Sequence, residues 1–137
     1  MKLCIKVLIS IISVYVMVGC AATMSSDYLS KDTYLISSSA DEFAYNNTDL
    51  CFKYMAALTT KRAGKNFFRI VNSKERLNGG FGSDYSFNDV DFSYYEPSTY
   101  LKDGVIQIFK DRPKNLVSYN ATKVINDTDP SKCSESR

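Results

Sequence analysis

A short apolar segment that ends in a cysteine constrains this 137-residue chain more than any other feature. Residues 1–6 carry two lysines, residues 7–18 are mostly apolar, and Gly19-Cys20 follows directly. A positively charged start, an apolar run of this length and a small residue after it are typical of a secretory signal peptide. The run is too short for a membrane-spanning helix, which needs roughly 20 apolar residues.

The pair Gly19-Cys20 is typical of a lipoprotein signal, in which the cysteine receives a lipid and becomes the new N-terminus. We therefore expect residues 1–19 to be removed and Cys20 to hold the chain to a membrane, because two or more acyl chains anchor a protein stably. Ala21 follows the cysteine, and in a diderm bacterium this resembles lipoproteins of the outer membrane that face the periplasm. The alternative is an ordinary secretory signal with an incidental cysteine.

Removing residues 1–19 leaves 118 of the 137 residues, enough for one small domain. This part loses the two early lysines and carries 15 basic and 15 acidic residues, so its net charge gives no argument for binding nucleic acid. The sequence has no histidine, which excludes Ser-His and Cys-His catalytic pairs and the common zinc sites. We expect no enzyme, no catalytic residue, no metal or other cofactor, and no small-molecule substrate.

The cysteines that remain after Cys20 are Cys51 and Cys133. An exported chain is in an oxidising compartment, so we expect these two to form a disulfide. Closing a loop of this length would stabilise the fold by about 4 kcal/mol. The alternative is that Cys51 is a small core residue and Cys133 a free thiol.

Helical spacing is clearest between residues 48 and 63, where apolar residues fall on one face. Asn47 or Thr48 can cap the start of this helix, and Gly64 can end it. Short β-branched and aromatic runs predict strands at residues 33–37, 67–71, 104–110, 116–119 and 122–125. The apolar face is made by Leu50, Cys51, Tyr54, Met55, Ala57 and Leu58.

The stretch 72–99 is rich in Gly, Tyr, Ser and Asn, and we interpret it as a long loop. Long loops in compact domains are usually functional, and this composition resembles adaptable binding surfaces. The candidate binding surface consists of Tyr85, Phe87, Tyr94 and Tyr95. The alternative is an insertion without a partner. Asp103-Gly104 is a turn signal that precedes the next strand.

These elements predict a single α+β domain at residues 33–125, with one main helix packed on a mostly antiparallel sheet of about four strands. Residues 20–32 are small and polar and are expected to form the lipid anchor and a flexible tether. Residues 126–137 are expected to form a loose polar tail unless Cys133 ties them down.

Two segments resemble a family of small proteobacterial lipoproteins of unknown function. The helix carries Ala56-Ala57-Leu58, and Gly64 stands four residues before Phe68, as in that family. Tyr34 corresponds to its leading strand tyrosine, and Tyr119-Asn120-Ala121 is similar to its late Tyr-Asp-Ala segment. The resemblance covers roughly residues 34–71 and 105–125. It implies the anchor and the fold and transfers no catalytic residue.

The sequence therefore predicts a non-enzymatic cell-envelope module, attached to a membrane through Cys20, that binds another envelope protein. The alternative is a structural or stress-related envelope lipoprotein without a specific partner.

Overall fold

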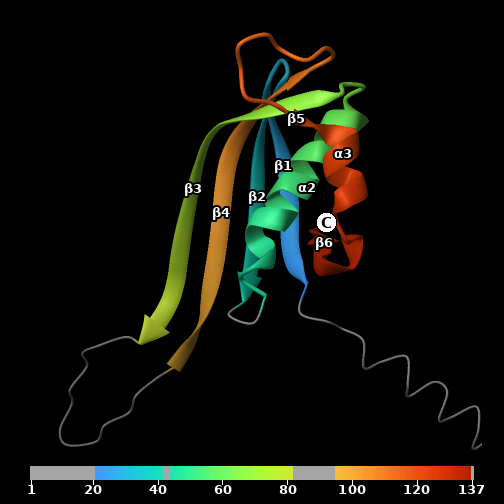
Figure 1. Cartoon of the computed structure of the whole chain (residues 1–137). Helices are drawn as coiled ribbons and strands as arrows, with labels where there is room; N and C mark the ends of the chain where they lie inside the picture. Colours follow the sequence, from blue (N-terminus) through green and yellow to red (C-terminus); the bar gives the residue numbers. More distant parts are fainter. Residues whose placement is uncertain (1–20, 42–43, 82–94, 137) are drawn as a thin grey trace, which may run out of the picture.

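The computed structural model describes residues 21–41, 44–81 and 95–136. Six strands form one sheet in the order β5-β3-β4-β2-β1-β6. Neighbouring strands are antiparallel, except that β6 runs parallel to β1. The sheet curls into a half-barrel (Figure 1). The strands are β1 (Ala22–Ser30), β2 (Thr33–Asp41), β3 (Phe67–Phe81), β4 (Tyr95–Phe109), β5 (Tyr119–Asn120) and β6 (Cys133–Glu135).

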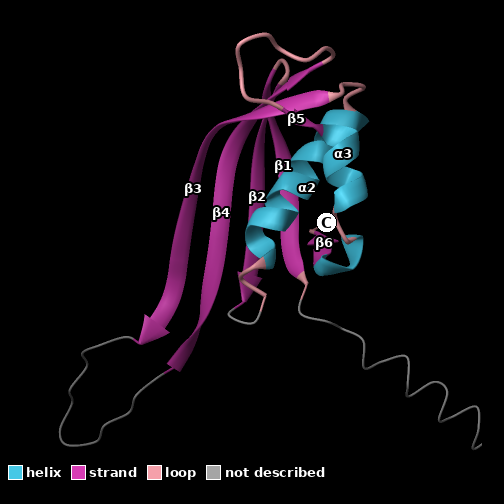
Figure 2. Cartoon of the chain, in the orientation of Figure 1, coloured by secondary structure: helices cyan, strands magenta, loops and turns pink. Residues whose placement is uncertain are grey.

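Among the described residues, two α-helices accompany this sheet, α2 (Asn47–Arg62) and α3 (Ala121–Asp127), with a short 3₁₀ turn at Pro130–Lys132. Strands make up more of the described chain than helices do (Figure 2). The predicted architecture, one main helix on about four antiparallel strands, is therefore wrong: the sheet has six strands and is mixed. Two of the added strands, β1 and β6, lie in segments that we expected to be unstructured.

Most of the expected tether, residues 20–32, forms strand β1, which lies next to the edge strand β6. β1 pairs with β2 along its length and with β6 over residues 22–24. Ala22 and Met24 are buried, so the chain is held in the fold two residues after Cys20. Serine and alanine give no strand signal here, and the strand forms because both of its edges find partners.

The longest strands, β3 and β4, form a ribbon that extends beyond α2 (Figure 1). The loop predicted at residues 72–99 is thus wrong for residues 72–81 and 95–99, which continue these strands. Asp103-Gly104 is not a turn, because it lies inside β4 opposite residues 73 and 74. Gly104 is needed for close packing: a Cβ there would lie 2.7 Å from the Cζ of Phe52.

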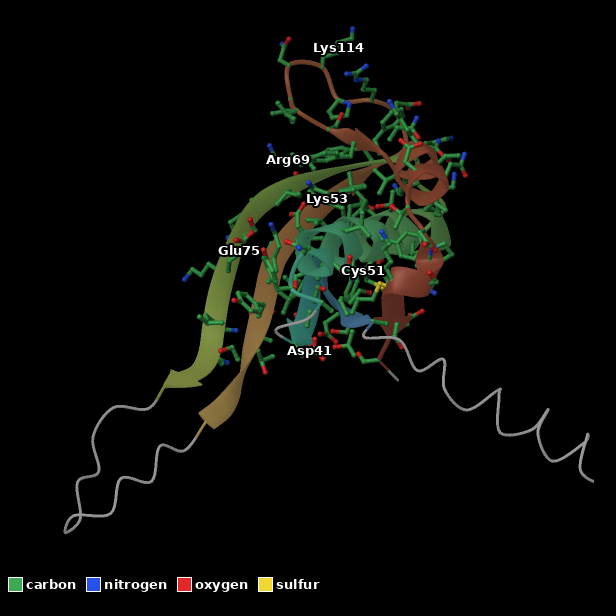
Figure 3. The ribbon with its side chains drawn as sticks, turned by 60° about the horizontal axis from the view of Figure 1, so that its bottom comes forward. Asp41, Cys51, Lys53, Arg69, Glu75 and Lys114 are labelled. Carbon is green, nitrogen blue, oxygen red and sulfur yellow. A yellow bond between two sulfur atoms is a disulfide. The ribbon has the colours of Figure 1, made fainter. Side chains whose placement is uncertain are left out.

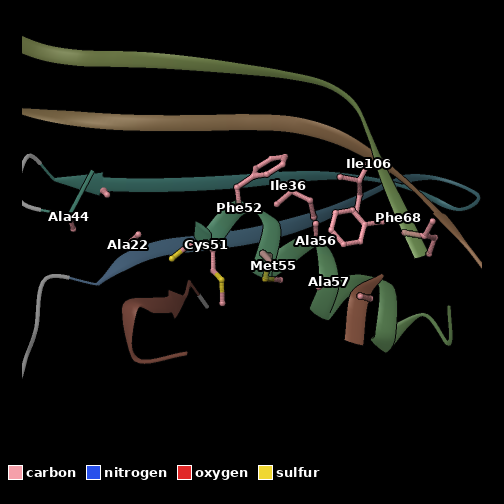
Figure 4. Close-up of a cluster of buried hydrophobic side chains, with 14 residues drawn as sticks. Ala22, Ile36, Ala44, Cys51, Phe52, Met55, Ala56, Ala57, Phe68 and Ile106 are labelled. Carbon is pink, nitrogen blue, oxygen red and sulfur yellow. The ribbon is translucent and has the colours of Figure 1, made fainter. Parts of the chain in front are cut away.

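Helix α2 agrees with the prediction to within one residue at each end. Gly64 has a φ of 70°, the left-handed conformation that commonly follows a helix. The cap expected from Asn47 or Thr48 is wrong, because both residues lie inside the helix; the N-cap is Asn46, whose side chain makes no capping hydrogen bond. The buried face packs against the sheet to form the core (Figure 4). Its largest fully buried side chains are Phe52 and Met55 from α2, Ile36 from β2, Phe68 from β3 and Ile106 from β4.

The C-terminal segment is ordered by a covalent bond. Cys51 and Cys133 form the expected disulfide, with an S–S distance of 1.98 Å. Arg62 donates two hydrogen bonds to Glu135, at 2.6 and 2.8 Å. The predicted loose tail therefore carries β6. The strand predicted at residues 122–125 is instead the helix α3, because the Asn120 side chain accepts a hydrogen bond from the backbone N–H of Lys123 and caps it.

Candidate functional site

A groove of about 530 Å³ lies between the start of α2 and the β3–β4 ribbon. We call it the Lys102 groove. The stick view shows Glu75 on β3 and Lys53 on α2 in this part of the molecule (Figure 3). The groove is lined by Tyr45, Asn46, Thr48, Asp49, Glu75, Arg76, Leu77, Tyr100, Leu101 and Lys102.

Lys102 is the buried cation of this groove and is only 8% exposed. Its Nζ donates hydrogen bonds to Asp49 Oδ1 at 2.6 Å and to Glu75 Oε1 at 2.7 Å. Lys53 donates to the other oxygen of Asp49 at 2.7 Å. The Lys102 ammonium also lies 5.6 Å from the centre of the Phe52 ring. Two carboxylates and one ring face therefore compensate the buried charge.

These contacts also fix the protonation states. Burial alone would lower the pKa of Lys102, but the hydrogen bonds from Lys102 to Asp49 and Glu75 outweigh burial and raise it. Burial alone would raise the pKa of Asp49, but its hydrogen bonds from Lys102 and Lys53 lower it. The lowered pKa of Asp49 and the raised pKa of Lys102 keep this pair charged at neutral pH, so Lys102 is an ammonium group without a free lone pair.

Apolar and aromatic side chains form the walls of the groove. The rings of Tyr45 and Tyr100 are in contact, with their centres 5.1 Å apart. Tyr45 is 49% exposed and Leu77 is 56% exposed, so both present apolar surface to solvent. The hydroxyl of Thr48 is buried in the lining and has no hydrogen-bond partner among the described residues. An apolar wall with few polar groups is the usual composition of a binding site.

A bulge in β3 decides which side chains enter the groove. The register of β3 against β4 shifts between Ile70 and Asn72, so Val71 is an extra residue. After this shift Glu75 lies opposite Lys102 and Leu77 opposite Tyr100. Side chains alternate between faces along a strand, so without the extra residue these side chains would point to the other face.

The outer edge of β3 adjoins the groove. On this side β3 pairs with β5 only at Phe67 and Phe68. Along the rest of β3, no other strand of the described chain pairs with this edge. Unpaired N–H and C=O groups of such an edge can hydrogen-bond to an added strand. Charged residues 74–76, Lys-Glu-Arg, interrupt the edge and disfavour nonspecific pairing.

The predicted site residues are only partly covered by the structure. Tyr85, Phe87 and Tyr94 lie outside the described residues, and so do Gly19 and Cys20. Tyr95 begins β4 and pairs with Phe81. Cys51 and Cys133 are brought together in the disulfide.

Sequence reasoning missed the Lys102 groove. Its β3 residues fell in the stretch that we interpreted as a loop. One signal was present in the sequence. When β3 and β4 are paired, residues 73, 75 and 77 lie opposite residues 104, 102 and 100, so these six side chains share one face of the ribbon.

Within the described ranges, no helix is long and apolar enough to cross a bilayer. The same ranges contain no group of three or more Cys, Asp or Glu side chains placed to hold a metal ion. No protein-family model, curated protein or solved structure matches the chain significantly, so the lipoprotein-family resemblance stays a prediction.

Proposed function

We propose that this protein is a membrane-anchored, non-enzymatic module of the cell envelope that binds an extended segment of another envelope protein. The observation that carries the proposal is an apolar-walled groove next to the unpaired edge of β3. A segment added to this edge would gain main-chain hydrogen bonds, and every second side chain would face the groove.

The chemistry of the groove supports binding over catalysis. Lys102 is satisfied by two carboxylates, and its raised pKa keeps it charged, so it has no free base to offer. Tyr45, Leu77 and Tyr100 form the accessible apolar part of the walls, beside the exposed side chains of Glu75 and Arg76. Tyrosine is enriched at protein interfaces because one side chain supplies both apolar area and a polar hydroxyl.

The anchor in this proposal is lipidated Cys20, exposed by cleavage after Gly19, in the outer membrane facing the periplasm. Ala22 is buried in the sheet, so only Ala21 would separate the anchor from the folded domain. The domain would then lie against the lipid surface. The start of α2, which lines the Lys102 groove, lies toward the end of the molecule at which β1 begins (Figure 1), so the partner would be another protein close to that surface.

Site-specific photo-crosslinking in cells of the native host tests this proposal. A photoreactive phenylalanine analogue at Leu77 faces the groove, and the same analogue at Asn78 serves as the matched control, because the neighbouring residue lies on the opposite face of β3. We expect a discrete protein adduct from position 77 and none from position 78. The adduct should weaken in a Cys20→Ser background, where the anchor is absent.

Equal or absent adducts at both positions would reject the groove as the binding site and favour the structural lipoprotein without a specific partner. Equal membrane association of the parent and Cys20→Ser forms would reject the anchor independently of the groove. The two parts of the proposal can therefore fail separately.

A further inference from the structure

Three chain segments meet at the end of the molecule that lies opposite the start of β1 (Figure 1). They are the β1–β2 turn at residues 28–32, the connection at residues 63–66, and the loop at residues 110–118. Hydrogen bonds hold them at the end of β4: Ile108 N–H of β4 donates to Asp32 O of the turn at 2.9 Å, and the Asn66 side chain donates to Lys110 O at 3.1 Å. We call these three segments the basic end.

The basic end concentrates positive charge. Lys31, Lys110, Arg112 and Lys114 are exposed there, and none of them forms a salt bridge within the described chain. Lys114 stands at the tip of the loop (Figure 3). The three segments also hold Lys65, which pairs with Asp32, and the exposed Asp111, so five cations stand against two carboxylates. Because the charges of the chain after residue 19 sum to zero, this local excess is a separation of charge along the molecule. A local cationic surface attracts anions even where the net charge is zero.

Exposed apolar side chains stand among these cations. Val117 is 84% exposed and Leu116 is 43% exposed in the same loop. Leu29, on the neighbouring turn, is 51% exposed. Aliphatic side chains at the tips of two adjacent segments, surrounded by lysine and arginine, match the interface region of a bilayer, where apolar groups enter the acyl boundary and cations stay at the phosphates.

A cavity beneath the loop offers room for a headgroup. It has a volume of about 570 Å³, and Arg112 and Lys123 contribute to its lining. The hydroxyl of Ser118 is buried in the same lining and has no hydrogen-bond partner among the described residues. Asp127 also lines the cavity, so the lining carries two cations, Arg112 and Lys123, and one carboxylate. This combination suits a phosphodiester, which carries one negative charge and accepts several hydrogen bonds.

We infer that the basic end binds an anionic phospholipid surface, with Leu29 and Val117 entering the interface and the surrounding cations contacting phosphates. The surface binding itself does not depend on the anchor or on the Lys102 groove. One consequence rests on the proposed anchor: β1 spans nine residues, about 30 Å, so a chain lipidated at Cys20 would direct this end toward a second, facing surface.

Vesicle co-sedimentation tests the inference with the chain from residue 20 onward carrying Cys20→Ser, which contains every described element. The probes are vesicles of equal phosphatidylglycerol and phosphatidylcholine, and vesicles of phosphatidylcholine alone. The test variant is Lys110→Glu with Lys114→Glu, and the matched control is Lys74→Glu with Lys132→Glu, which makes the same charge change elsewhere. All four lysines are exposed, so equal urea unfolding curves are expected for all proteins.

We expect binding to the anionic vesicles only, and a loss of about 25-fold or more in the test variant, because each cation near an anionic surface contributes roughly a fivefold factor. The control variant should change binding by no more than about twofold. Val117→Asp should also weaken binding, and raising the salt from about 0.1 M to 1 M, which shortens the screening length, should reduce it further.

Equal binding to neutral vesicles, or equal loss in the control variant, would overturn the inference. Absence of binding to both vesicle types would do the same, and capture of an acidic protein by a crosslinker at Val117 would then identify a protein as the partner. None of these outcomes depends on the crosslinks from the Lys102 groove or on retention through Cys20.

Discussion

Substituting alanine for Gly104 should destabilise this protein, although a glycine inside a strand is ordinarily a weak point. An alanine Cβ would lie 2.7 Å from both the backbone oxygen of Asn72 and the Cζ of Phe52. Ordinary contact begins at 3.4 Å, so each neighbour would have to move by about 0.7 Å. Phe52 is fully buried, and Asn72 is held opposite Val105 in the ladder.

The expected cost follows from two opposing terms. Forcing an extra methyl into a packed core costs about 1–3 kcal/mol. Replacing glycine in a strand returns about 0.5–1 kcal/mol, because the unfolded chain loses entropy. The free energy of unfolding should therefore fall by about 1–2 kcal/mol. For a domain of this size, that lowers the Tm by roughly 4–8 °C.

Urea and thermal unfolding of Gly104→Ala would measure this change. The substitution Phe52→Leu removes the ring that the new methyl meets, so the double variant should cost about 1 kcal/mol less than the sum of the single variants. An alanine variant as stable as the parent would refute the reasoning. Strict additivity with Phe52→Leu would show that the ring is not the source of the cost.

Four further predictions concern the covalent bond, the ion cluster and the bulge. Cys133→Ser opens a loop with a sequence separation of 82 and should lower the free energy of unfolding by about 4 kcal/mol. Adding a reductant should lower the free energy of unfolding of the parent protein and leave that of the variant unchanged. Lys102→Met should lower the free energy of unfolding, measured in urea, by about 1–3 kcal/mol. This is less than the cost of breaking a fully buried ion pair, because Asp49 is half exposed. The folded-state pKa of Asp49 is lowered from 3.8, so the stability that its carboxylate contributes is present above pH 3.8 and is lost as the pH falls below that value. Asp49→Asn should therefore reduce the difference in the free energy of unfolding between pH 5 and pH 3. Deleting Val71 should turn Leu77 to the other face, and a photo-crosslink from that residue should disappear while far-UV circular dichroism is retained.

Elements with local signals could be predicted from the sequence. The limits of α2 were predicted to within one residue, because the spacing of its apolar residues, its basic last turn and Gly64 all indicate the same helix. The disulfide followed from the number of cysteines and the expected compartment. In both cases, the evidence lay within one segment or in a simple count.

Elements that depend on distant partners could not be predicted. β1 is a strand only because β2 and β6 pair with its two edges, and β6 is in place because Cys133 is bonded to Cys51. Gly104 looked like part of a turn, whereas its role is to make room for Phe52, a residue far away in the sequence. Local patterns cannot distinguish a glycine of a turn from a glycine of a close contact.

The groove was missed for the same reason. Its lining comes from the start of α2 and from two strands, and the bulge at Val71 changes the face on which Glu75 and Leu77 lie. A regular alternation through residue 71 would place them on the opposite face. The buried position of Lys102 also cannot be recognised in the sequence, because its counter-charges are 27 and 53 residues away.

The entry of β1 into the sheet has a mechanical consequence. A pull on residue 20 would act along the axis of β1, whose hydrogen bonds to β2 run across that axis. Such a load shears many bonds together instead of opening them one by one. In the proposed arrangement, with a lipid on Cys20 and a partner in the Lys102 groove, tension between the two would therefore be transmitted through the folded domain, with little slack in the linkage.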